Sequence, residues 1–133
     1  MKWKLLVYFI VFFSIFSNSF SIEPDIFVQS TVNSASKIIG EVISKDKKIE
    51  KLKLIAKETV DIKGIGFYTL GAKRKSLNDE EKRKYSILFD KYFLKSFSSR
   101  LAEYTNPEID VITKEKINNK YTIVNSILKA TKE

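Results

Sequence analysis

The sequence predicts a small α+β protein, in which a mainly helical N-terminal part packs on a short antiparallel β-hairpin. Apolar residues recur at steps of three and four between residues 24 and 104, which is the spacing of amphipathic helices. Two strand-like apolar segments then flank Asn118 and Asn119 near the C-terminus. The length of 133 residues, with 44% apolar and 30% charged residues, is typical of one globular domain.

Two helices at the start of the predicted domain are defined by this periodicity. The first begins at Pro24, whose missing N–H is harmless in a first helical turn, and continues to about Val42. Residues 44–46 interrupt the pattern, and a second helix is expected from about Lys47 to Val60. Each has its apolar residues on one face, as amphipathic helices do.

Two further helices are delimited by capping residues. A short helix is expected over residues 62–70, with Asp61 at its N-cap and Gly71 at its C-cap, although two internal glycines lower its propensity. The segment 78–81, Asn-Asp-Glu-Glu, has the arrangement of a capping box. It starts a long helix that runs to about Tyr104.

The hairpin is predicted from two strands, Glu108–Lys116 and Lys120–Ala130, joined by a two-residue turn at Asn118-Asn119. A two-stranded sheet is marginally stable in water, and its open edges invite pairing with another chain. Three possibilities therefore stay open. Helices cover the hairpin, another copy completes the sheet, or the sequence is shorter than its fold requires.

The long helix has an apolar stripe that is mostly aromatic. Such a stripe either fills a core or lines a wide apolar cavity, and periodicity favours the core. The members of the stripe are Tyr85, Leu88, Phe89, Tyr92, Phe93, Phe97, Leu101 and Tyr104.

Residues 1–21 have the three-part layout of a secretory signal peptide. Two lysines precede an apolar segment over residues 5–16, and small serines precede a cleavage site after Ser21. The apolar segment is shorter than the ~20 residues of a membrane-spanning helix. We expect residues 22–133 to form a single domain outside the cytoplasm, and an uncleaved signal anchor is the alternative.

The residue types present exclude several classes of site. The sequence has no cysteine, so it offers no disulfide, thiolate ligand or cysteine nucleophile. It also has no histidine, the commonest general base and transition-metal ligand. We therefore expect a protein that is not an enzyme, without catalytic residues, metal or cofactor, although composition does not exclude a serine–lysine nucleophile. A binding, carrier or structural role is favoured.

The formal net charge of +8 comes almost entirely from lysine. The only arginines are Arg74, Arg83 and Arg100, whereas proteins that recognise nucleic acids rely on the bidentate arginine fork. We therefore predict a solvated lysine-rich surface and no nucleic-acid partner. A weak attraction to anionic membrane headgroups stays open.

Three segments follow one another in an order that resembles a known family. They are Pro24–Val28, with the pattern Pro-x-x-Phe-Val, Phe67–Gly71, which ends in Leu-Gly, and Asp79–Tyr85. Phe89, Leu94, Tyr104 and the strand pair follow. This order resembles the MlaC-type periplasmic phospholipid-binding proteins, also called the toluene-tolerance auxiliary family of a lipid ABC transport system. The resemblance covers nearly all of the chain after the signal segment, and it rests on order and spacing.

The sequence departs from the family pattern in two respects. Its basic segment Lys73-Arg74-Lys75 lacks the family's tryptophan. Family members also continue past this point with further strands and a C-terminal helix, and those strands help to build the lipid pocket. A truncated gene product, a fragment of a longer reading frame and a reduced member that dimerises are the open explanations.

The resemblance implies a carrier without catalysis. Family members hold phospholipid acyl chains in an apolar cavity between helices and sheet, and shuttle lipid between an inner-membrane ABC transporter complex and an outer-membrane lipoprotein complex. Phospholipid and these complexes are the implied partners, and a homodimer is a further option. The alternative is a truncated or remnant member that acts as a non-carrier structural or adaptor protein.

With the resemblance, the cavity and core interpretations of the aromatic stripe become equally favoured. The residues expected in the cavity wall are chosen by facing and apolarity, and they are Phe67, Leu70, Phe89, Phe93, Phe97, Leu101, Tyr121 and Ile123. Lys73, Arg74 and Lys75 are candidates for contact with a phosphate headgroup or an acidic partner. An exposed basic loop that only aids solubility is the alternative.

Overall fold

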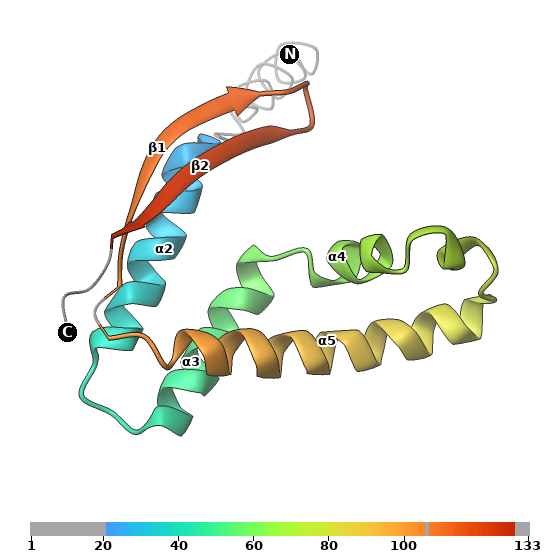
Figure 1. Cartoon of the computed structure of the whole chain (residues 1–133), viewed down its shortest axis with the longest axis horizontal. Helices are drawn as coiled ribbons and strands as arrows, with labels where there is room; N and C mark the ends of the chain where they lie inside the picture. The colour runs from blue at the N-terminus through green and yellow to red at the C-terminus, as the bar shows by residue number, and fades with distance from the viewer. Residues whose placement is uncertain (1–20, 106, 130–133) are drawn as a thin grey trace, which may run out of the picture.

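The computed structural model describes residues 21–105 and 107–129, so the expected signal peptide lies outside the described residues except for Ser21. Helices precede a two-stranded antiparallel sheet, which confirms the predicted α+β class (Figure 1). The elements are α2 (Pro24–Gly40), α3 (Lys45–Thr59), α4 (Ile62–Thr69), the 3-10 helix η1 (Gly71–Lys75), α5 (Asp79–Leu101), β1 (Glu108–Lys116) and β2 (Thr122–Lys129).

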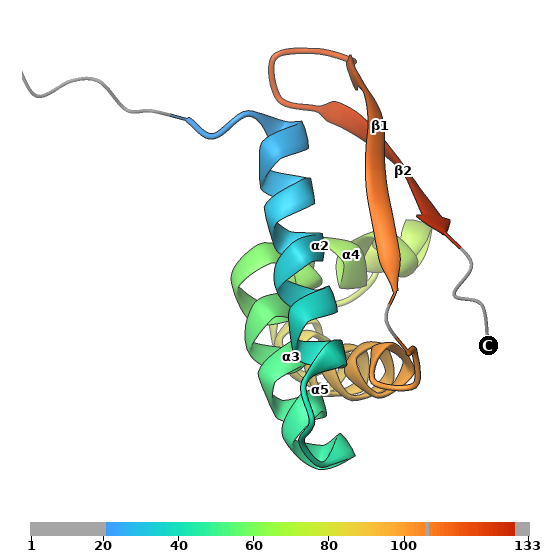
Figure 2. The same cartoon turned by 90° about the vertical axis from the view of Figure 1, so that its left-hand side faces the viewer.

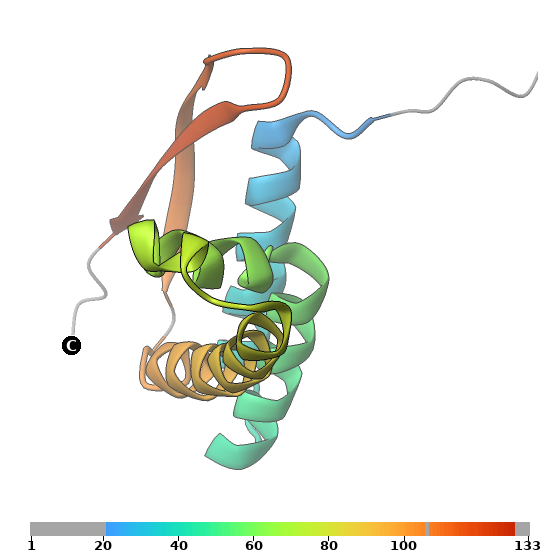
Figure 3. The same cartoon turned by 90° about the vertical axis from the view of Figure 1, so that its right-hand side faces the viewer.

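The described elements form two arms that meet at α3. The hairpin arm consists of α2, β1 and β2, and the hairpin lies along α2 mainly through β1. The helical arm consists of α4, η1 and α5, with α4 packed on α5. Because α3 packs against both α2 and α5, it joins the arms, which extend in different directions from it (Figures 1, 2 and 3).

The helices confirm the predicted order, with small differences at their ends. The hydroxyl of Ser44 accepts a hydrogen bond from the backbone N–H of Lys47 at 3.4 Å, so α3 begins at Lys45. The interruption seen in the sequence is therefore a cap followed by a first turn. α2 and α5 end slightly earlier than predicted, at Gly40 and Leu101.

The capping predictions for α4 and α5 are confirmed. A carboxylate oxygen of Asp61 accepts from the N–H of Gly64 at 2.9 Å. Asn78 accepts from the N–H of Glu81, and the Glu81 carboxylate accepts from the N–H of Asn78, which completes a capping box. Gly71 has φ +55°, the left-handed conformation expected where α4 ends.

The structure corrects two loop predictions. The basic segment expected as a loop is the 3-10 helix η1. The turn of the hairpin is longer than two residues, because the side chain of Asn118 accepts from the N–H groups of Lys120 and Tyr121 at 2.8 and 3.0 Å. The backbone N–H groups of Ile117 and Asn118 both bond to the Tyr121 carbonyl, so β2 begins only at Thr122.

A β-bulge interrupts the pairing of β1 with β2. Val111 lies opposite Ser126 and Thr113 lies opposite Asn125, which leaves Ile112 without an opposite residue. An extra residue of this kind bends the strand that carries it. The hairpin accordingly curves along α2 (Figure 1).

The main buried apolar cluster lies where α3, α4 and α5 meet. A Cβ atom at Gly66 would come within 2.8 Å of the Phe89 ring, so only glycine allows α4 to approach α5 this closely. The glycine that weakens α4 locally therefore permits its packing. The buried members of the cluster are Ala56, Ile62 and Leu94, and Val60, Phe89 and Phe93 pack against them.

Candidate functional site

An apolar cavity of about 240 Å³ lies at the junction of the two arms. Helix α2 contributes Val32 and Ala35 to its wall, and α3 contributes Ile55 and Ala56. The alanines are small side chains on two neighbouring helices, so they leave space between them. The end of α5 and the inner side of the hairpin complete the wall.

The serine and threonine hydroxyl groups in the cavity wall are engaged by the backbone, and Tyr104 is the remaining hydroxyl-bearing residue in the wall. The hydroxyls of Thr31 and Thr59 donate to carbonyl oxygens four residues earlier in their own helices, at 2.9 and 2.8 Å. Ser36 donates to the carbonyl oxygen of the buried residue Pro107 at 2.9 Å. Because these donors are occupied, this part of the wall presents hydrocarbon to a ligand. An apolar chain fits such a wall better than a polar molecule does.

The hairpin forms one side of the cavity through Ile109 of β1 and Leu128 of β2. These two residues lie opposite each other in the sheet, so their side chains are on the same face. The position of the hairpin on α2 therefore determines how wide the cavity is. That position is set by polar contacts.

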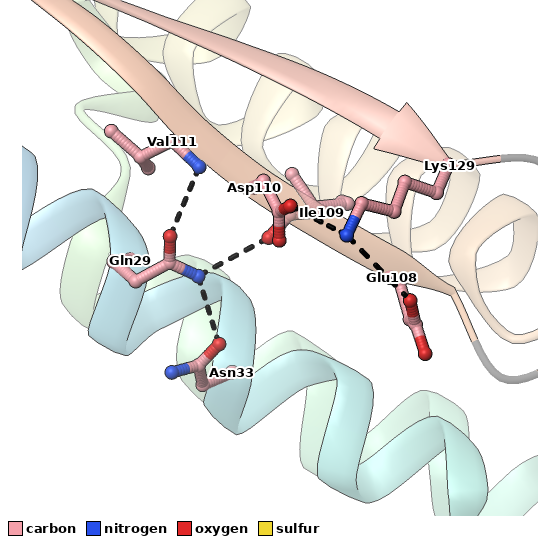
Figure 4. A network of polar contacts seen from close by, with 7 residues as sticks. All are labelled: Gln29, Asn33, Glu108, Ile109, Asp110, Val111 and Lys129. Atoms are coloured by element: carbon pink, nitrogen blue, oxygen red, sulfur yellow. Dashed lines mark hydrogen bonds and ion pairs between the residues drawn. The ribbon is translucent and has the colours of Figure 1, made fainter.

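A side-chain amide fastens β1 to α2. The Nε2 atom of Gln29 donates to the carbonyl oxygen of Ile109 at 3.2 Å, and its Oε1 atom accepts from the N–H of Val111 at 3.0 Å (Figure 4). The Nε2 atom also donates to Asn33 at 2.9 Å, which orients the amide. Gln29 thus pairs with the edge of β1 as a neighbouring strand would.

An ion-pair network holds the other end of β1. The Nζ atom of Lys114 lies 2.7 Å from a carboxylate oxygen of Glu23 and 2.8 Å from one of Asp25. The hydrogen bond from Lys114 lowers the pKa of Asp25, and the bonds to Asp25 and then Glu23 raise the pKa of Lys114. Both shifts favour the charged forms, so the pair is retained at neutral pH.

A second ion pair crosses the hairpin itself. The Nζ atom of Lys129 lies 2.6 Å from a carboxylate oxygen of Asp110 and 4.0 Å from one of Glu108 (Figure 4). The hydrogen bond to Asp110 raises the pKa of Lys129. These contacts join the strands at the end of the hairpin next to the cavity.

The aromatic stripe of α5 divides between core and cavity. Phe97 and Leu101 line the cavity, whereas Phe89 and Phe93 pack against the buried cluster. The ring centroids of Phe89 and Phe93 are 6.1 Å apart, and those of Phe93 and Phe97 are 5.2 Å apart. A row of stacked rings therefore connects the core to the cavity wall.

The remaining predicted wall residues lie elsewhere. Phe67 lies in α4 and Leu70 is the C-cap residue of that helix, and neither lines the apolar cavity. Tyr121 lies in the hairpin turn and Ile123 follows it in β2, both exposed and both away from the cavity lining. The face of an element and the apolar character of a residue could not distinguish these positions from true wall residues. The reason is that the cavity is formed by contacts between elements that are distant in the sequence.

Sequence reasoning missed the wall residues of α2, α3 and the hairpin. For α2 and α3, the apolar faces of the two helices already indicated these residues, and Ala35 and Ala56 are the small side chains on those faces. Pro107, Ile109 and Leu128 gave no such signal, because the sequence does not reveal which face of the hairpin meets α2.

A more open basic hollow of about 440 Å³ lies between α4 and α5. Lys63, Lys82 and Arg83 line it together with Phe67. The Nζ atom of Lys63 lies 6.0 Å from the centroid of the Phe67 ring. The predicted headgroup or partner residues, Lys73-Arg74-Lys75, are exposed on η1 and line neither this hollow nor the cavity.

Other kinds of site are not found in the described part of the chain. Among residues 21–105 and 107–129, no group of three or more acidic side chains is placed to hold a metal ion. None of the helices in the same ranges combines the length and the apolar character that crossing a bilayer requires.

A comparison with family models identifies residues 29–133 as matching the family described as MlaC protein. The match includes α2 from Gln29 onward and every later element, and it confirms the resemblance stated above. The comparisons with curated proteins and with solved structures found no match.

Proposed function

The chain belongs to the MlaC family, and from this premise we propose that it is a periplasmic phospholipid carrier. Family membership supports a phospholipid-binding role in periplasmic transport, and the family is one of transport proteins and not of enzymes. The finer proposal is that acyl chains enter the apolar cavity. The protein then shuttles lipid between the inner-membrane ABC transporter complex and the outer-membrane lipoprotein complex.

The observation that carries this proposal is the chemistry of the cavity wall. Aliphatic side chains and the rings of Phe97 and Tyr104 surround it, and the hydroxyls of Thr31, Ser36 and Thr59 are occupied. Burial of hydrocarbon stabilises a complex by ~0.8 kcal/mol per methylene. A wall of this kind therefore supports extraction of an acyl chain from a bilayer, while the headgroup stays in water.

The size of the cavity requires a movement during loading. Its volume of about 240 Å³ lies below the roughly 300–1,000 Å³ typical of ligand pockets, so it accepts part of one acyl chain as it stands. We propose that the hairpin moves away from α2 to admit more of the lipid. The contacts of Gln29 and Lys114 are the ones that this movement would break.

The basic residues of the helical arm are proposed to contact the headgroup or a partner complex. The 3-10 helix η1 carries Lys73-Arg74-Lys75, and the hollow is lined by Lys63, Lys82 and Arg83. Positive charge is therefore concentrated on this arm. An acidic surface on either membrane complex would be attracted to them. A cleaved signal peptide within residues 1–21 would deliver the protein to the periplasm, and a second copy of the chain is a further proposed partner.

Purification without detergent from the periplasm, followed by native mass spectrometry, tests the carrier proposal. The expected result is a folded protein with added mass matching a phospholipid. Ala35→Trp fills the cavity and should reduce bound lipid at least roughly tenfold, since the indole ring occupies the space in which most of the methylenes of the acyl chain would be buried. Ala72→Trp, on the exposed η1, is the matched control and should keep its lipid.

Two results would contradict the carrier proposal. One is a folded wild-type protein that carries no lipid and takes none from anionic vesicles. The other is an Ala35→Trp protein that retains as much lipid as the Ala72→Trp control. The first result would favour the second candidate function, a non-carrier structural or adaptor protein, which the small volume of the cavity also favours.

A further inference from the structure

Positive charge is unevenly distributed along the chain, and the helical arm holds much of it. Residues 63–84 contain seven basic and three acidic side chains, so this segment has a net charge of +4. The whole chain has a formal net charge of +8, so half of it lies in α4, η1 and the first turns of α5. An anion that approaches the protein is therefore attracted to this arm.

The basic hollow of about 440 Å³ is the concave part of this charged surface. Helix α4 contributes Lys63 and Phe67 to its wall, and α5 contributes Lys82, Arg83 and Ser86. The ammonium of Lys63 lies 6.0 Å from the centroid of the Phe67 ring, which favours its position beside the hollow. Because α4 packs on α5, the fold holds cations from two helices around one space (Figure 1).

The carboxylate in the wall of the hollow does not neutralise these cations. Asp79 is the acidic residue that lines the hollow, and its Oδ1 atom lies 3.8 Å from the Nζ atom of Lys82. Its side chain is 96% exposed, and ion pairs at such exposed positions are weak. Neither Lys63 nor Arg83 forms an ion pair with another described residue. Three cations face one carboxylate, so the hollow retains a net positive charge.

We propose that the hollow binds a phosphate group, carried by an anionic phospholipid headgroup or free in solution. The guanidinium of Arg83 can donate two parallel N–H bonds to a phosphate, and Lys63 and Lys82 add point charges. The hydroxyl of Ser86 is a further donor. A zwitterionic headgroup would bring its ammonium next to these cations, so anionic headgroups are favoured. For a lipid, the inference rests on the proposed function and deepens it, because it names the preferred class of cargo.

Helix α5 connects the hollow to the apolar cavity. Ser86 lines the hollow and Phe97 lines the cavity, and eleven residues are close to three whole turns, so both lie on one side of α5 about 16 Å apart. The hydrocarbon of one leaflet is about 15 Å thick, half of a bilayer core. An acyl chain whose phosphate occupies the hollow would thus reach the cavity, which then holds only the end of the chain. Asp90, partly exposed on the same side, would repel a phosphate placed closer to the cavity.

Two probes test the site with the full mature chain and distinguish the two sources of phosphate. Inorganic phosphate is titrated against a chloride control of equal ionic strength, and NMR should show saturable shifts of the amides of Phe67 and Ser86. Vesicles with equal amounts of phosphatidylglycerol and phosphatidylethanolamine are then offered to the protein. Mass spectrometry of the bound lipid should show an excess of phosphatidylglycerol.

Two double variants separate the hollow from the general charge of the arm. K63Q/R83Q and R74Q/K84Q each remove one lysine and one arginine, all four at exposed positions, but only the first pair lines the hollow. K63Q/R83Q should weaken phosphate binding by roughly tenfold or more and abolish the lipid preference. R74Q/K84Q should change either by less than about twofold, because salt screens distant charges. Asp79→Asn removes the carboxylate and should strengthen phosphate binding. Circular dichroism checks that each variant is folded.

Two results would overturn the proposal: a wild-type protein that shows neither phosphate shifts at the hollow nor a headgroup preference, or equal losses in the two double variants. Phosphate binding without a lipid preference would assign the hollow to free phosphate. The amount of bound lipid separates this inference from the carrier function. Lipid bound without phosphate shifts or headgroup preference contradicts only the phosphate site, whereas phosphate binding by a protein that takes up no lipid contradicts only the carrier.

Discussion

The helical arm buries apolar side chains against α3, whereas the hairpin is held to α2 by a side-chain amide, a serine hydroxyl and a lysine ion pair. In the helical arm, Leu94 is 6% exposed and stacked rings extend the packing along α5. In the hairpin, most residues of β2 are exposed. The first arm depends on packing, and the second depends on a few directed polar contacts.

This difference indicates where the molecule opens. Apolar packing is lost only when a whole helix separates from the buried cluster, so we expect the helical arm to unfold together with the core. The contacts of the hairpin join residues 80 and 91 positions apart, namely Gln29 with Ile109 and Glu23 with Lys114, and water can replace each of them. Because the hairpin forms one side of the cavity, the weaker arm is the one that would move in the proposed loading of lipid.

The largest expected effect comes from Leu94→Ala in the helical arm. Truncation leaves a hole between α5 and the buried cluster and should lower the free energy of unfolding by about 2–5 kcal/mol. Leu88→Ala, at a position 57% exposed on the same helix, is the matched control and should change it by less than about 0.5 kcal/mol. Urea denaturation followed by circular dichroism measures both, and equal losses would contradict the packing account.

The second prediction concerns the amide that fastens the hairpin. Gln29→Ala leaves the carbonyl of Ile109 and the N–H of Val111 without their partner, and should cost about 1–3 kcal/mol. The expected readout is local, since amide hydrogen exchange should accelerate in β1 and stay unchanged at Leu94. Asn33→Ala removes only the group that orients the amide, so its effect should be smaller. Equal acceleration in both arms would show that the hairpin does not open separately.

The same contrast explains what the sequence could predict. The N-caps of α4 and α5 follow from neighbouring residues, such as Asn78 with Glu81, and these N-terminal boundaries were predicted correctly. Local chemistry determines them, so a single sequence is sufficient. The partner of Gly66, in contrast, is Phe89 on another helix, and the sequence indicated only that this glycine weakens α4.

The candidate site was predicted only in part for the same physical reason. The aromatic stripe of α5 is one continuous pattern, yet Phe93 packs in the core and Phe97 lines the cavity, because the stripe passes from one neighbour to another. Ile109 and Leu128 enter the wall only because the hairpin docks on α2. That docking depends on Gln29, a polar residue that no apolar pattern selects.

A smaller effect of opposite sign is expected at Ser98, where α5 is fully buried. Its hydroxyl oxygen has no hydrogen-bond partner among the described residues. Ser98→Ala removes an unsatisfied polar group at nearly constant volume and should raise the free energy of unfolding by up to ~1 kcal/mol. Ser96→Ala, at an exposed position of the same helix, should leave it unchanged. A loss of stability in Ser98→Ala would mean that the hydroxyl is engaged in solution.

The smallest expected effect is the pH dependence of the hairpin arm. The pKa of Asp25 is lowered in the folded protein by its hydrogen bond from Lys114, so its stabilisation is fully present above the unfolded pKa. It is lost as the pH falls through the lowered folded value. The pKa of Lys114 is raised, so its contribution is lost only as the pH rises through that raised value, above the ordinary 10.5.

Hydrogen exchange of β1 at neutral and acidic pH measures this effect. Measured relative to the intrinsic amide rate, which itself falls in acid, exchange in β1 should be faster at acidic pH, because protonated Asp25 no longer pairs with Lys114. Asp25→Asn should exchange faster already at neutral pH and should respond less to acid, while Asp46→Asn in the first turn of α3 should behave as wild type. An unchanged acid response in Asp25→Asn would assign the pH dependence to another carboxylate, and Glu23, the other partner of Lys114, would be tested next.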